Sequence, residues 1–479
     1  MKLNMKPTTL LSKSLISLAA LATLGGCASV NIDQSIDRAN LETKTIAGAA
    51  TQLLRTAEAK TARDLQVAEL LKSPLNQQAA VQLAIINSPA LQTMLAERWL
   101  DMAQAAQGGR IANPILSLER MRSLDELEYG RILAFGLLDL ITLPQRKKIA
   151  TARMAQTELQ MTADVVGLIS KVRMAWVAAV AASESATYSK LVYESAQASA
   201  ELAKRMQTVG NFNRLQRARQ QAFYADASIQ LLASQHTATA TREALVRLLG
   251  LKDTDIAKLS LPERLPDLPQ SFLSPEAVSK ALTNQRLDVR MAQSQLDTAS
   301  KSQGLNLLTS LTDIELGVIR NTVKDTVEGT SEKSKGYELS IRLPIFDWGD
   351  AQRASMNAAT LAAANRMEAA IIGAGSDLRE SYSAYRTAYD ASRQYRDEIL
   401  PLSKVIAEEN GLRYNGMFIG VFELLADHRS QINTVKAAIA AQQQFWQADA
   451  ALQATLLGKP MSAPSMPMGS SSDGDAPAH

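Results

Sequence analysis

The segment GYELSIRLPIFDWG, residues Gly336 to Gly349, decides the fold because its side chains alternate between apolar and polar with a period of two. This period predicts a β-strand with one apolar face. The two faces would carry Tyr337, Leu339, Ile341 and Leu343 on one side and Glu338, Ser340 and Arg342 on the other. Helix-forming sequence follows Gly349, so we expect a strand that leads directly into a long helix.

Three other segments have strand character. DIELGVI (313–319) also alternates, and PILSLERM (114–121) and YGRILAFGLLDLITL (129–143) occupy the equivalent places in the first half of the chain, with poorer alternation. The polar segments 121–128 and 320–335 would join each pair as solvent loops. Two hairpins, about four strands, are therefore expected.

An apolar strand face opposite a polar one is what a membrane barrel requires, with lipid outside and water inside. Four strands cannot close a barrel, and open sheet edges in hydrocarbon are very costly. If the strands span a membrane, several chains must therefore pool them. The alternative left open is a water-facing hairpin on a coiled-coil protein.

Long helices are expected between the strand pairs. Residues 145–208 contain no proline and only one glycine, Gly167, and about 64 helical residues would measure roughly 96 Å. VGNFN (209–213) interrupts this run, and helical sequence then continues to Leu249. A second long helix is expected from about 350 to 410, bent by Gly373, Gly375 and Pro401.

The same order of segments occurs twice, which indicates an internal repeat. Asn87 pairs with Asn284, Leu143-Pro144 with Leu343-Pro344, and Gly250 with Gly458. The predicted domains are a signal peptide (1–26), an N-terminal periplasmic segment (27–74), the first repeat (75–258), a proline-rich linker (259–275), the second repeat (276–458) and a disordered tail (459–479).

The N-terminal segment carries the only cysteine, Cys27. Before it come a basic start and an apolar run too short to span a bilayer, which is the layout of a secretory signal. Leu24-Gly25-Gly26-Cys27 fits the bacterial lipoprotein signal, so we expect a covalent lipid, including palmitate, on Cys27 and no other cofactor. Ala28 rather than Asp follows, which favours sorting to the outer membrane. The alternative is a plain secretory signal with an incidental cysteine.

Composition excludes several classes of function. The 51 Lys and Arg nearly balance the 48 Asp and Glu, with no basic block suited to nucleic acid. One cysteine permits no internal disulfide, and the three histidines are far apart, with no HExxH, GxGxxG, Walker or GxSxG motif. We therefore expect no enzyme and no catalytic metal. No apolar stretch of about 18 residues follows the signal, so no membrane helix is expected.

The repeats, the lipoprotein signal, LPIFDWG (343–349) and RYNGMFIGVFELLADHRSQ (413–431) together resemble the TolC-like outer-membrane efflux channels. The resemblance covers about residues 75 to 458. It implies a mainly α-helical chain with a membrane β-barrel: a homotrimer in the Gram-negative outer membrane, with a 12-stranded barrel and a helical tube through the periplasm. It further implies a tripartite efflux system with a periplasmic adaptor protein and an inner-membrane pump.

The resemblance assigns roles to three groups of residues. The strand-to-helix junctions would contain Pro144, Pro344, Phe346, Asp347, Trp348 and Gly349. The helix turns would dock the adaptor through Gly210, Asn211, Gly416, Met417 and Gly420, where glycine permits a tight backbone. Arg413 and Tyr414 would form bonds that hold the closed state, or would be ordinary surface residues.

A carboxylate gate is expected beside the second turn. Glu423 and Asp427 are four residues apart and share one helical face. Threefold repetition would bring about six carboxylates to a narrow mouth that favours cations. Glu423 falls where the family often has an acidic constriction residue, but the next expected acid falls on Ala426. The alternative is that both carboxylates are solvated surface charges.

The cargo is the least determined feature. Met461, Met466, Met468 and His479 in the tail are soft ligands suited to Cu(I) or Ag(I), and YNGMFIGVFELLAD resembles the heavy-metal-resistance branch of the family. The alternative is a disordered tail with incidental methionines. Two other classes stay open: a lipid-anchored periplasmic coiled-coil scaffold without a pore, and an envelope hydrolase, for which the sequence offers no catalytic constellation.

Overall fold

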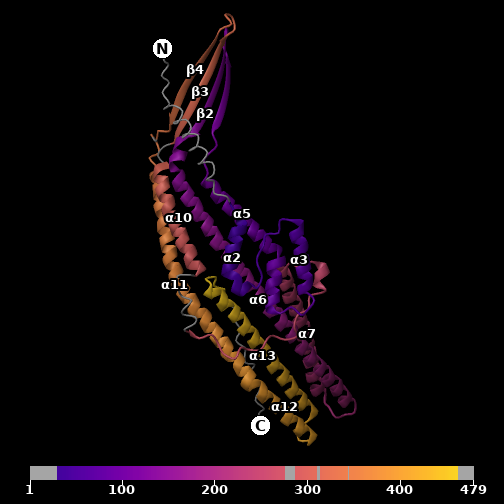
Figure 1. The fold of residues 1–479 in the computed structure, drawn as a ribbon. Coiled ribbons are helices and arrows are strands. Elements are labelled where there is room, and N and C mark those ends of the chain that lie inside the picture. The colour runs from indigo at the N-terminus through magenta and orange to yellow at the C-terminus, as the bar shows by residue number, and fades with distance from the viewer. Residues whose placement is uncertain (1–29, 276–285, 310–312, 344, 462–479) are drawn as a thin grey trace. The chain divides into compact units, whose positions relative to one another are not determined.

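The computed structural model describes residues 30–275, 286–309, 313–343 and 345–461 (Figure 1). They form two units: unit 1 holds residues 30–35, Ala96–Gln160 and Arg290–Ala370, and unit 2 holds Ile36–Leu95, Met161–Val289 and residues 371–461. In chain order the elements are α2 (Ile32–Ala47), α3 (Ala57–Leu70), α4 (Gln77–Asn87), α5 (Pro89–Gly108), β1 (Ile115–Arg122), β2 (Glu126–Gly136), α6 (Leu137–Thr208), α7 (Arg214–Leu249), α8 (Asp253–Ile256), α10 (Leu287–Thr309), β3 (Ile314–Asp325), β4 (Ser331–Ile341), α11 (Asp350–Gln394), a π-helix (Tyr395–Ile399), α12 (Leu400–Asn415) and α13 (Val421–Leu456).

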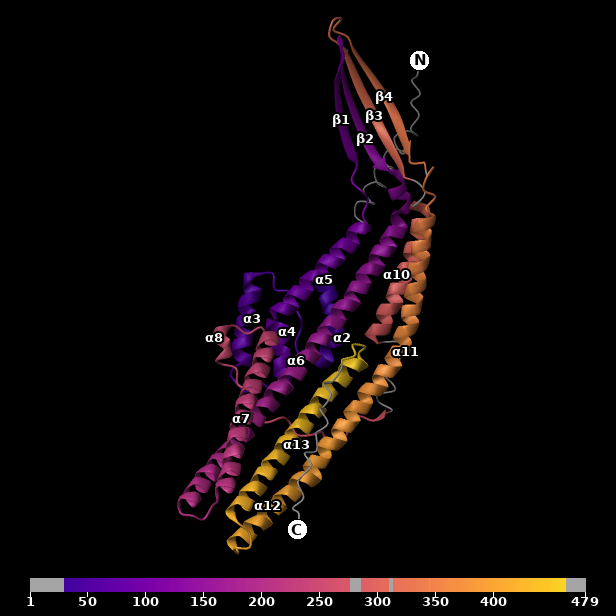
Figure 2. The ribbon, with the colours of Figure 1, turned by 180° about the vertical axis from the view of Figure 1, so that it is seen from behind.

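Unit 1 contains one antiparallel sheet in the order β1-β2-β3-β4, visible in Figures 1 and 2. The two predicted hairpins are confirmed, and β2 pairs with β3 to join them although the hairpins are far apart in the sequence. One cross-strand row illustrates the register: Leu116 is opposite Leu133, Leu133 is opposite Val318, and Val318 is opposite Tyr337.

The predicted strand boundaries are wrong at three places. Of the expected loops, only residues 123–125 and 326–330 lie between strands, and residues 137–143 begin α6 rather than extend β2. The loops were overestimated because their residues are charged on both strand faces, so apolar alternation disappears. Residues from 137 onward are helical because Asp139 lies in the first turn, where acids are favourable, and pairs with Arg146 at 2.6 Å.

The second long helix changes its hydrogen-bonding pattern near Pro401, one of the three residues expected to bend it. Gly373 and Gly375 lie inside α11 and do not end it. The π-helix Tyr395–Ile399 directly precedes α12, whose second residue is Pro401. A wider helical turn at this point accommodates a ring that cannot donate a backbone hydrogen bond.

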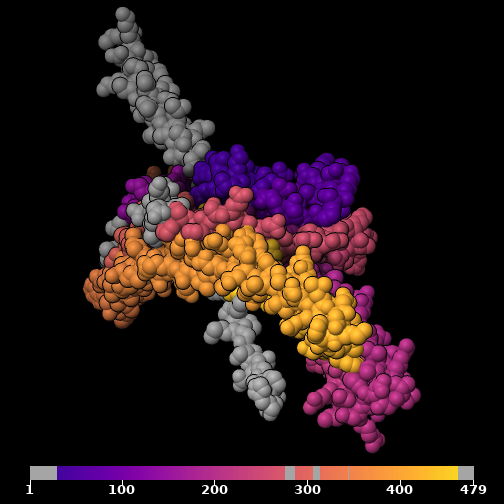
Figure 3. Space-filling view, turned by 90° about the horizontal axis from the view of Figure 1, so that it is seen from below, coloured from indigo at the N-terminus to yellow at the C-terminus, as the bar shows by residue number. Residues whose placement is uncertain are grey.

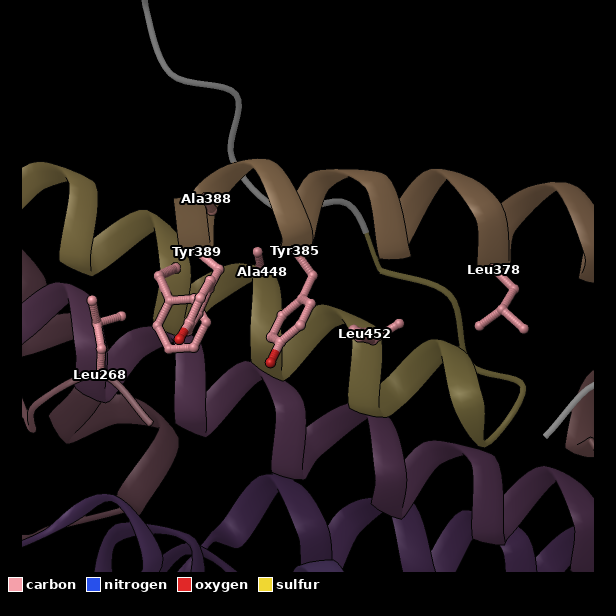
Figure 4. Packing of buried hydrophobic residues seen from close by; sticks show 8 residues of the cluster. Leu268, Leu378, Tyr385, Ala388, Tyr389, Ala448 and Leu452 are labelled. Carbon is pink, nitrogen blue, oxygen red and sulfur yellow. The ribbon is translucent and has the colours of Figure 1, made fainter. Parts of the chain in front are cut away.

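The core of unit 2 includes an aromatic cluster between α11 and α13 (Figure 4). Phe445 is fully buried, and its ring centroid lies 5.5 Å from that of Tyr385 and 5.7 Å from that of Tyr389. The cluster comprises Leu268, Leu378, Tyr385, Ala388, Tyr389, Phe445, Ala448 and Leu452. Small alanines allow the two helices to approach while the large rings fill the space between them.

The proline-rich linker is fastened to this cluster. The Trp446 indole donates to the carbonyl of Pro266 at 3.0 Å, the Tyr389 hydroxyl donates to that of Pro269 at 3.2 Å, and the Tyr382 hydroxyl donates to that of Leu273 at 3.1 Å. Aromatic side chains of the cluster and its edge thereby donate hydrogen bonds to three carbonyls of the linker.

Two glycines end helices in equivalent ways. Gly250 after α7 and Gly458 after α13 have φ of 67° and 83°, respectively. A Cβ on Gly250 would lie 2.3 Å from Cδ of Pro89, and one on Gly458 would lie 2.6 Å from the backbone nitrogen of Leu287. Only glycine fits both the left-handed backbone and the close approach.

The sequence analysis predicts no apolar segment long enough to span a membrane. By length and hydropathy alone, this prediction is wrong. Among the described residues, α6 contains an 18-residue window with a mean hydropathy of 1.6, and the bent pair α4–α5 also passes when taken together. The structure buries 67% of the α6 window, as it would in the core helix of a soluble protein.

A half-buried acid on α13 makes the stability of unit 2 depend on pH. Burial raises the pKa of Asp449 to about 6, although the charge of Arg173 and a hydrogen bond from Gln453 oppose this effect. Gln453 donates to Asp449 at 2.6 Å and accepts a hydrogen bond from Arg173, whose own pKa is lowered by burial.

We predict that the free energy of unfolding falls as the pH rises from about 4 to about 6. In this range the folded chain keeps Asp449 protonated while the unfolded chain has released the proton, which costs the folded state about 3 kcal/mol in total and is constant at higher pH. Asp449→Asn should lack this step. Denaturant unfolding at several pH values measures it, and equal slopes in the two proteins would contradict the assignment.

Candidate functional site

The two faces of the sheet carry opposite charge. Side chains alternate along each strand, and the register places alternate residues of the four strands on a common face. One face, the acidic face, contains every carboxylate of the four strands: Glu119, Glu126, Glu128, Glu315, Asp325, Glu332 and Glu338. The other, the basic-apolar face, contains every Arg and Lys of the strands together with their larger aliphatic and aromatic side chains, apart from Ile115, Met121, Ile132, Ile319 and Val323.

Contacts across the acidic face agree with the register. Asn321 donates a hydrogen bond to Glu128 at 2.9 Å. A Cβ added to Gly130 would lie 3.3 Å from Cβ of Glu119, and one added to Gly317 would lie 3.4 Å from Cβ of Glu338. Besides its carboxylates, this face is therefore lined largely by small residues, which leave room above the backbone.

The basic-apolar face has an apolar band at the helix end of the strands. The band comprises Leu116, Leu118, Leu133, Phe135, Ile314, Leu316, Val318, Tyr337, Leu339 and Ile341. The residues of this band on β1 and β2 are all exposed: Leu116, Leu118, Leu133 and Phe135. On β4, Tyr337, Leu339 and Ile341 are exposed as well. An exposed apolar area of this kind marks a surface that contacts lipid or protein.

The junction between β4 and α11 extends the exposed apolar surface of unit 1. Phe346 and Trp348 are 97% and 65% exposed. Asp347 accepts a hydrogen bond from the Gly349 backbone at 2.8 Å, and Gly349 has a φ of 68°, so the turn holds both rings outward. Pro344 lies outside the described residues. Pro144, expected at the equivalent junction, is instead inside α6 because that helix begins earlier.

The first helix turn, in unit 2, joins α6 to α7 through residues 209–213, as predicted. Gly210 is left-handed, with a φ of 81°, and the Asn211 backbone donates to the carbonyl of Met206 at 2.9 Å. Asn213 then caps α7 reciprocally with Gln216. This is a glycine-based helix ending followed by a capping box, so each feature follows from the local sequence.

The second turn, residues 416–420 between α12 and α13, uses a different residue in the left-handed position. Gly416 and Gly420 have φ of −79° and −82°, so the expectation that both need a permissive backbone is wrong. The left-handed residue is Met417, with a φ of 63°. A Cβ on Gly416 would lie 2.8 Å from the Phe418 ring, so a larger residue there would displace this ring. Met417 and Phe418 are 93% and 84% exposed.

The two turns touch each other. The ring centroids of Phe212 and Phe422 are 4.7 Å apart, and Figure 3 shows the magenta and yellow-orange turns side by side. Farther along the same helices the Arg429 guanidinium lies 3.9 Å from the ring centroid of Phe223. Both contacts join residues about 200 positions apart in the chain, so no local pattern predicts them, although the equivalent places of the two turns in the repeat were a usable signal.

The expected gate residues have different environments. Glu423 is exposed in the first turn of α13, whereas Asp427 is half-buried and accepts a hydrogen bond from Asn410 of α12 at 2.6 Å. Arg413 and Tyr414 are exposed, and their carbonyls accept the backbone hydrogen bonds of Phe418 and Met417 that close the turn. Glu423 is therefore the carboxylate available to an ion, and Asp427 is occupied in joining the two helices.

The remaining expected residues are at the chain ends. Cys27, Met466, Met468 and His479 lie outside the described residues. Met461 lines a cavity of about 180 Å³ together with Asp377 and Glu380. Within residues 30–275, 286–309, 313–343 and 345–461, no group of three or more His, Cys, Asp or Glu is placed to hold a metal ion.

Comparison with known proteins identifies the fold. No family model matches the sequence, and no curated protein matches it. A membrane protein from Pseudomonas aeruginosa is similar in structure, with a TM-score of 0.66 and 20% identity over 82% of this chain and 93% of that one. The outer membrane protein VceC from Vibrio cholerae gives 0.63 and 16% over 82% and 96%.

A third match is the MtrE outer membrane channel of Neisseria gonorrhoeae in its open state, with a TM-score of 0.61 and 20% identity over 84% of this chain and 91% of that one. At such identities the likeness establishes the fold and leaves function to the site. The predicted TolC-like fold, mainly helical with a four-stranded sheet in each chain, is confirmed.

We predict opposite effects of substitutions at the two left-handed positions. Gly210→Ala should destabilise its turn by about 1 kcal/mol, because its Cβ would meet open space and only the backbone is strained. Met417→Gly should stabilise the second turn by roughly 0.5–1 kcal/mol. Hydrogen exchange of the Asn211 and Phe418 amides measures the local opening free energy. Effects of the same sign at both turns would contradict the strain at Met417.

Proposed function

We propose that this chain is the outer-membrane channel of a tripartite efflux system and works as a homotrimer. Three copies would pool their sheets into one 12-stranded barrel, with the basic-apolar face toward lipid and the acidic face toward water. The helices would line a duct that exports small solutes, without catalysing a reaction. The fold supports this proposal, and the chemistry of the sheet carries it.

The observation that best supports the proposal is the distribution of side chains between the two faces of the sheet. An exposed apolar band on one face suits hydrocarbon, and carboxylates among small residues on the other suit a water-filled lumen. In the order β1-β2-β3-β4 the outer strands β1 and β4 each pair on one side only. Their second edges need partners in a membrane, and further copies of the same sheet supply them.

The helix turns support docking of a periplasmic adaptor protein. Met417 and Phe418 are large, apolar and exposed, and Met417 keeps a strained backbone where glycine would relax it. Strain that persists at an exposed residue points to a use for its side chain. An adaptor that covers these side chains would bury them as apolar anchors in pockets of its own surface. Gly210, Asn211 and Gly420 would shape the same surface.

Two further elements of the proposal rest on the sequence. A lipid on Cys27 would anchor the chain in the outer membrane of a Gram-negative bacterium. Soft heavy-metal ions such as Cu(I) or Ag(I) would be among the solutes, with the methionines of the tail as transient ligands. The rival proposal, a lipid-anchored periplasmic scaffold without a pore, would leave the apolar band and both sheet edges in water, where they favour aggregation.

We predict cation-selective conductance of the purified protein in planar bilayers. Glu119→Gln with Glu332→Gln and Glu338→Gln should at least halve the cation-to-anion permeability ratio, because the acidic face would then lose three charges per chain. A control with the same change in charge is Glu58→Gln with Asp64→Asn and Glu69→Gln on α3, which should keep the ratio. Absence of conductance, or a preference for anions, would contradict the proposed lumen.

A separate prediction concerns the turn carboxylates. Glu423→Gln should lower cation selectivity at least twofold, because this exposed carboxylate would recur three times at one mouth of the duct. Asp427→Asn should have a smaller effect, since Asp427 is engaged by Asn410. Permeability ratios of the two single variants measure this difference. Wild-type selectivity in Glu423→Gln would exclude this residue from the gate.

A further inference from the structure

Seven basic side chains form a belt on the basic-apolar face of the sheet, and every one is exposed. They lie between the apolar band and the hairpin turns. We call them the basic belt: Arg120, Arg122, Arg131, Arg320, Lys324, Lys333 and Lys335. The strands place no carboxylate on this face, so the belt cannot be neutralised from within its own surface.

Like charges face each other directly inside the belt. Arg131 is opposite Arg320, and Arg320 is opposite Lys335. Neighbouring strands are about 4.8 Å apart, so three cations occupy about 10 Å, and like charges in this cross-strand position destabilise a sheet. Among the ion pairs of the residues that the structure describes, none includes a belt residue; the pair nearest in sequence joins Arg342 to Asp313 at 3.7 Å. No carboxylate of the described residues therefore offsets the repulsion among Arg131, Arg320 and Lys335.

The belt directly continues the apolar band. Along β3 the last apolar residue of the band is Val318 and the first cation is Arg320, one side-chain repeat or about 7 Å farther. On β2, Tyr129 lies among the cations, with the Arg120 guanidinium 5.8 Å and the Lys324 ammonium 5.9 Å from its ring centroid. Apolar residues, then an amphipathic aromatic residue among cations, follow the order of acyl chains and head groups in a lipid leaflet.

We infer that the basic belt binds the phosphate groups of lipid head groups in the leaflet around the hairpin ends of the sheet. Phosphates seated between Arg131, Arg320 and Lys335 offset the cross-strand repulsion, and the two guanidinium groups bind phosphate oxygens in pairs. The acyl chains of the same lipid cover the apolar band. This inference rests on the proposed function, because it requires the basic-apolar face to be turned toward lipid.

The adjoining apolar band favours lipid over a soluble anion or a nucleic acid. A soluble polyanion would neutralise the belt but leave Leu116, Leu118 and Leu133 in water. A phosphorylated lipid satisfies both surfaces with one molecule. In a Gram-negative outer membrane the matching chemistry is a glycolipid with phosphorylated sugars, of the lipid A type.

The test uses the full chain, purified in a neutral detergent, and bisphosphorylated lipid A as the probe. In Arg131→Gln with Arg320→Gln and Lys335→Gln, the affinity should fall roughly a hundredfold, and wild-type binding should weaken with added salt. The matched control is Glu119→Gln with Glu332→Gln and Glu338→Gln on the acidic face, which should bind as the wild type does. Dephosphorylated lipid A tests whether binding depends on the phosphate groups of the lipid rather than on its acyl chains. Inorganic phosphate tests whether a free anion binds equally well.

Thermal unfolding gives a readout of opposite sign. Without lipid, the triple belt variant should melt at a higher temperature than the wild type because cross-strand repulsion is gone. Added lipid A should raise the melting temperature of the wild type and leave that of the variant unchanged. If the belt had only a structural role, added lipid A would not reverse the order of the two melting temperatures.

Planar-bilayer conductance distinguishes failure of this inference from failure of the channel. A belt variant that conducts and still binds lipid A with wild-type affinity overturns the belt and leaves the channel. Equal wild-type affinity for dephosphorylated lipid A, or competition by inorganic phosphate at the concentration of the lipid, also overturns it. A wild-type chain that binds lipid A through the belt but does not conduct supports the belt and overturns the channel.

Discussion

The sheet of one chain leaves two strand edges unpaired, and this constraint governs the rest of the structure. Its outer strands β1 and β4 each have one unpaired edge, all of β1 is exposed, and β4 is nearly so. A sheet with two open edges, whose burial is confined to its inner strands β2 and β3, has little hydrophobic burial to offset the entropy of ordering about forty residues. In the proposed channel, other copies of the sheet pair with these edges, and lipid covers one face. The proposal therefore supplies the contacts that the sheet of one chain lacks.

Unit 2 has the opposite character, because it carries its own core. Phe445 and the tyrosines of α11 fill the space between helices, and the linker is fastened by hydrogen bonds to Trp446 and Tyr389. Such a core over-determines the helices and allows local strain at their ends. Met417 is the example: its left-handed backbone costs about 1–2 kcal/mol, which a well-packed helical pair tolerates. The sheet has no comparable core, so in the proposed barrel its residues are constrained by lipid, lumen and neighbouring strands instead.

The sequence was informative where one physical signal dominated. Apolar alternation revealed β4 near Tyr337, and the absence of proline revealed α6. Where two signals overlap, prediction failed. The outer half of β3 reads as a loop because Arg320, Asn321 and Lys324 are polar on both faces, and only the paired register shows that the charges are sorted. The second turn was assigned to its glycines, but the left-handed position falls one residue later, on Met417. The contact between Phe212 and Phe422 depends on tertiary structure and has no local signature.

Net charge also concealed the most specific chemistry of the chain. A balance of +3 over 479 residues suggests no charged partner, and no run of consecutive bases is longer than the three at 146–148. Strand alternation nevertheless converts a mixed sequence such as Arg320 to Lys335 into two surfaces of opposite sign. On a helix the same residues would spread around the axis and neutralise one another at spacings of three and four. Only in a sheet does a period of two separate them completely, and only across a closed wall do the separated charges face different media. The charge pattern therefore has a use in a barrel that it would not have in a water-exposed hairpin, and this favours the barrel on electrostatic grounds independent of the apolar band.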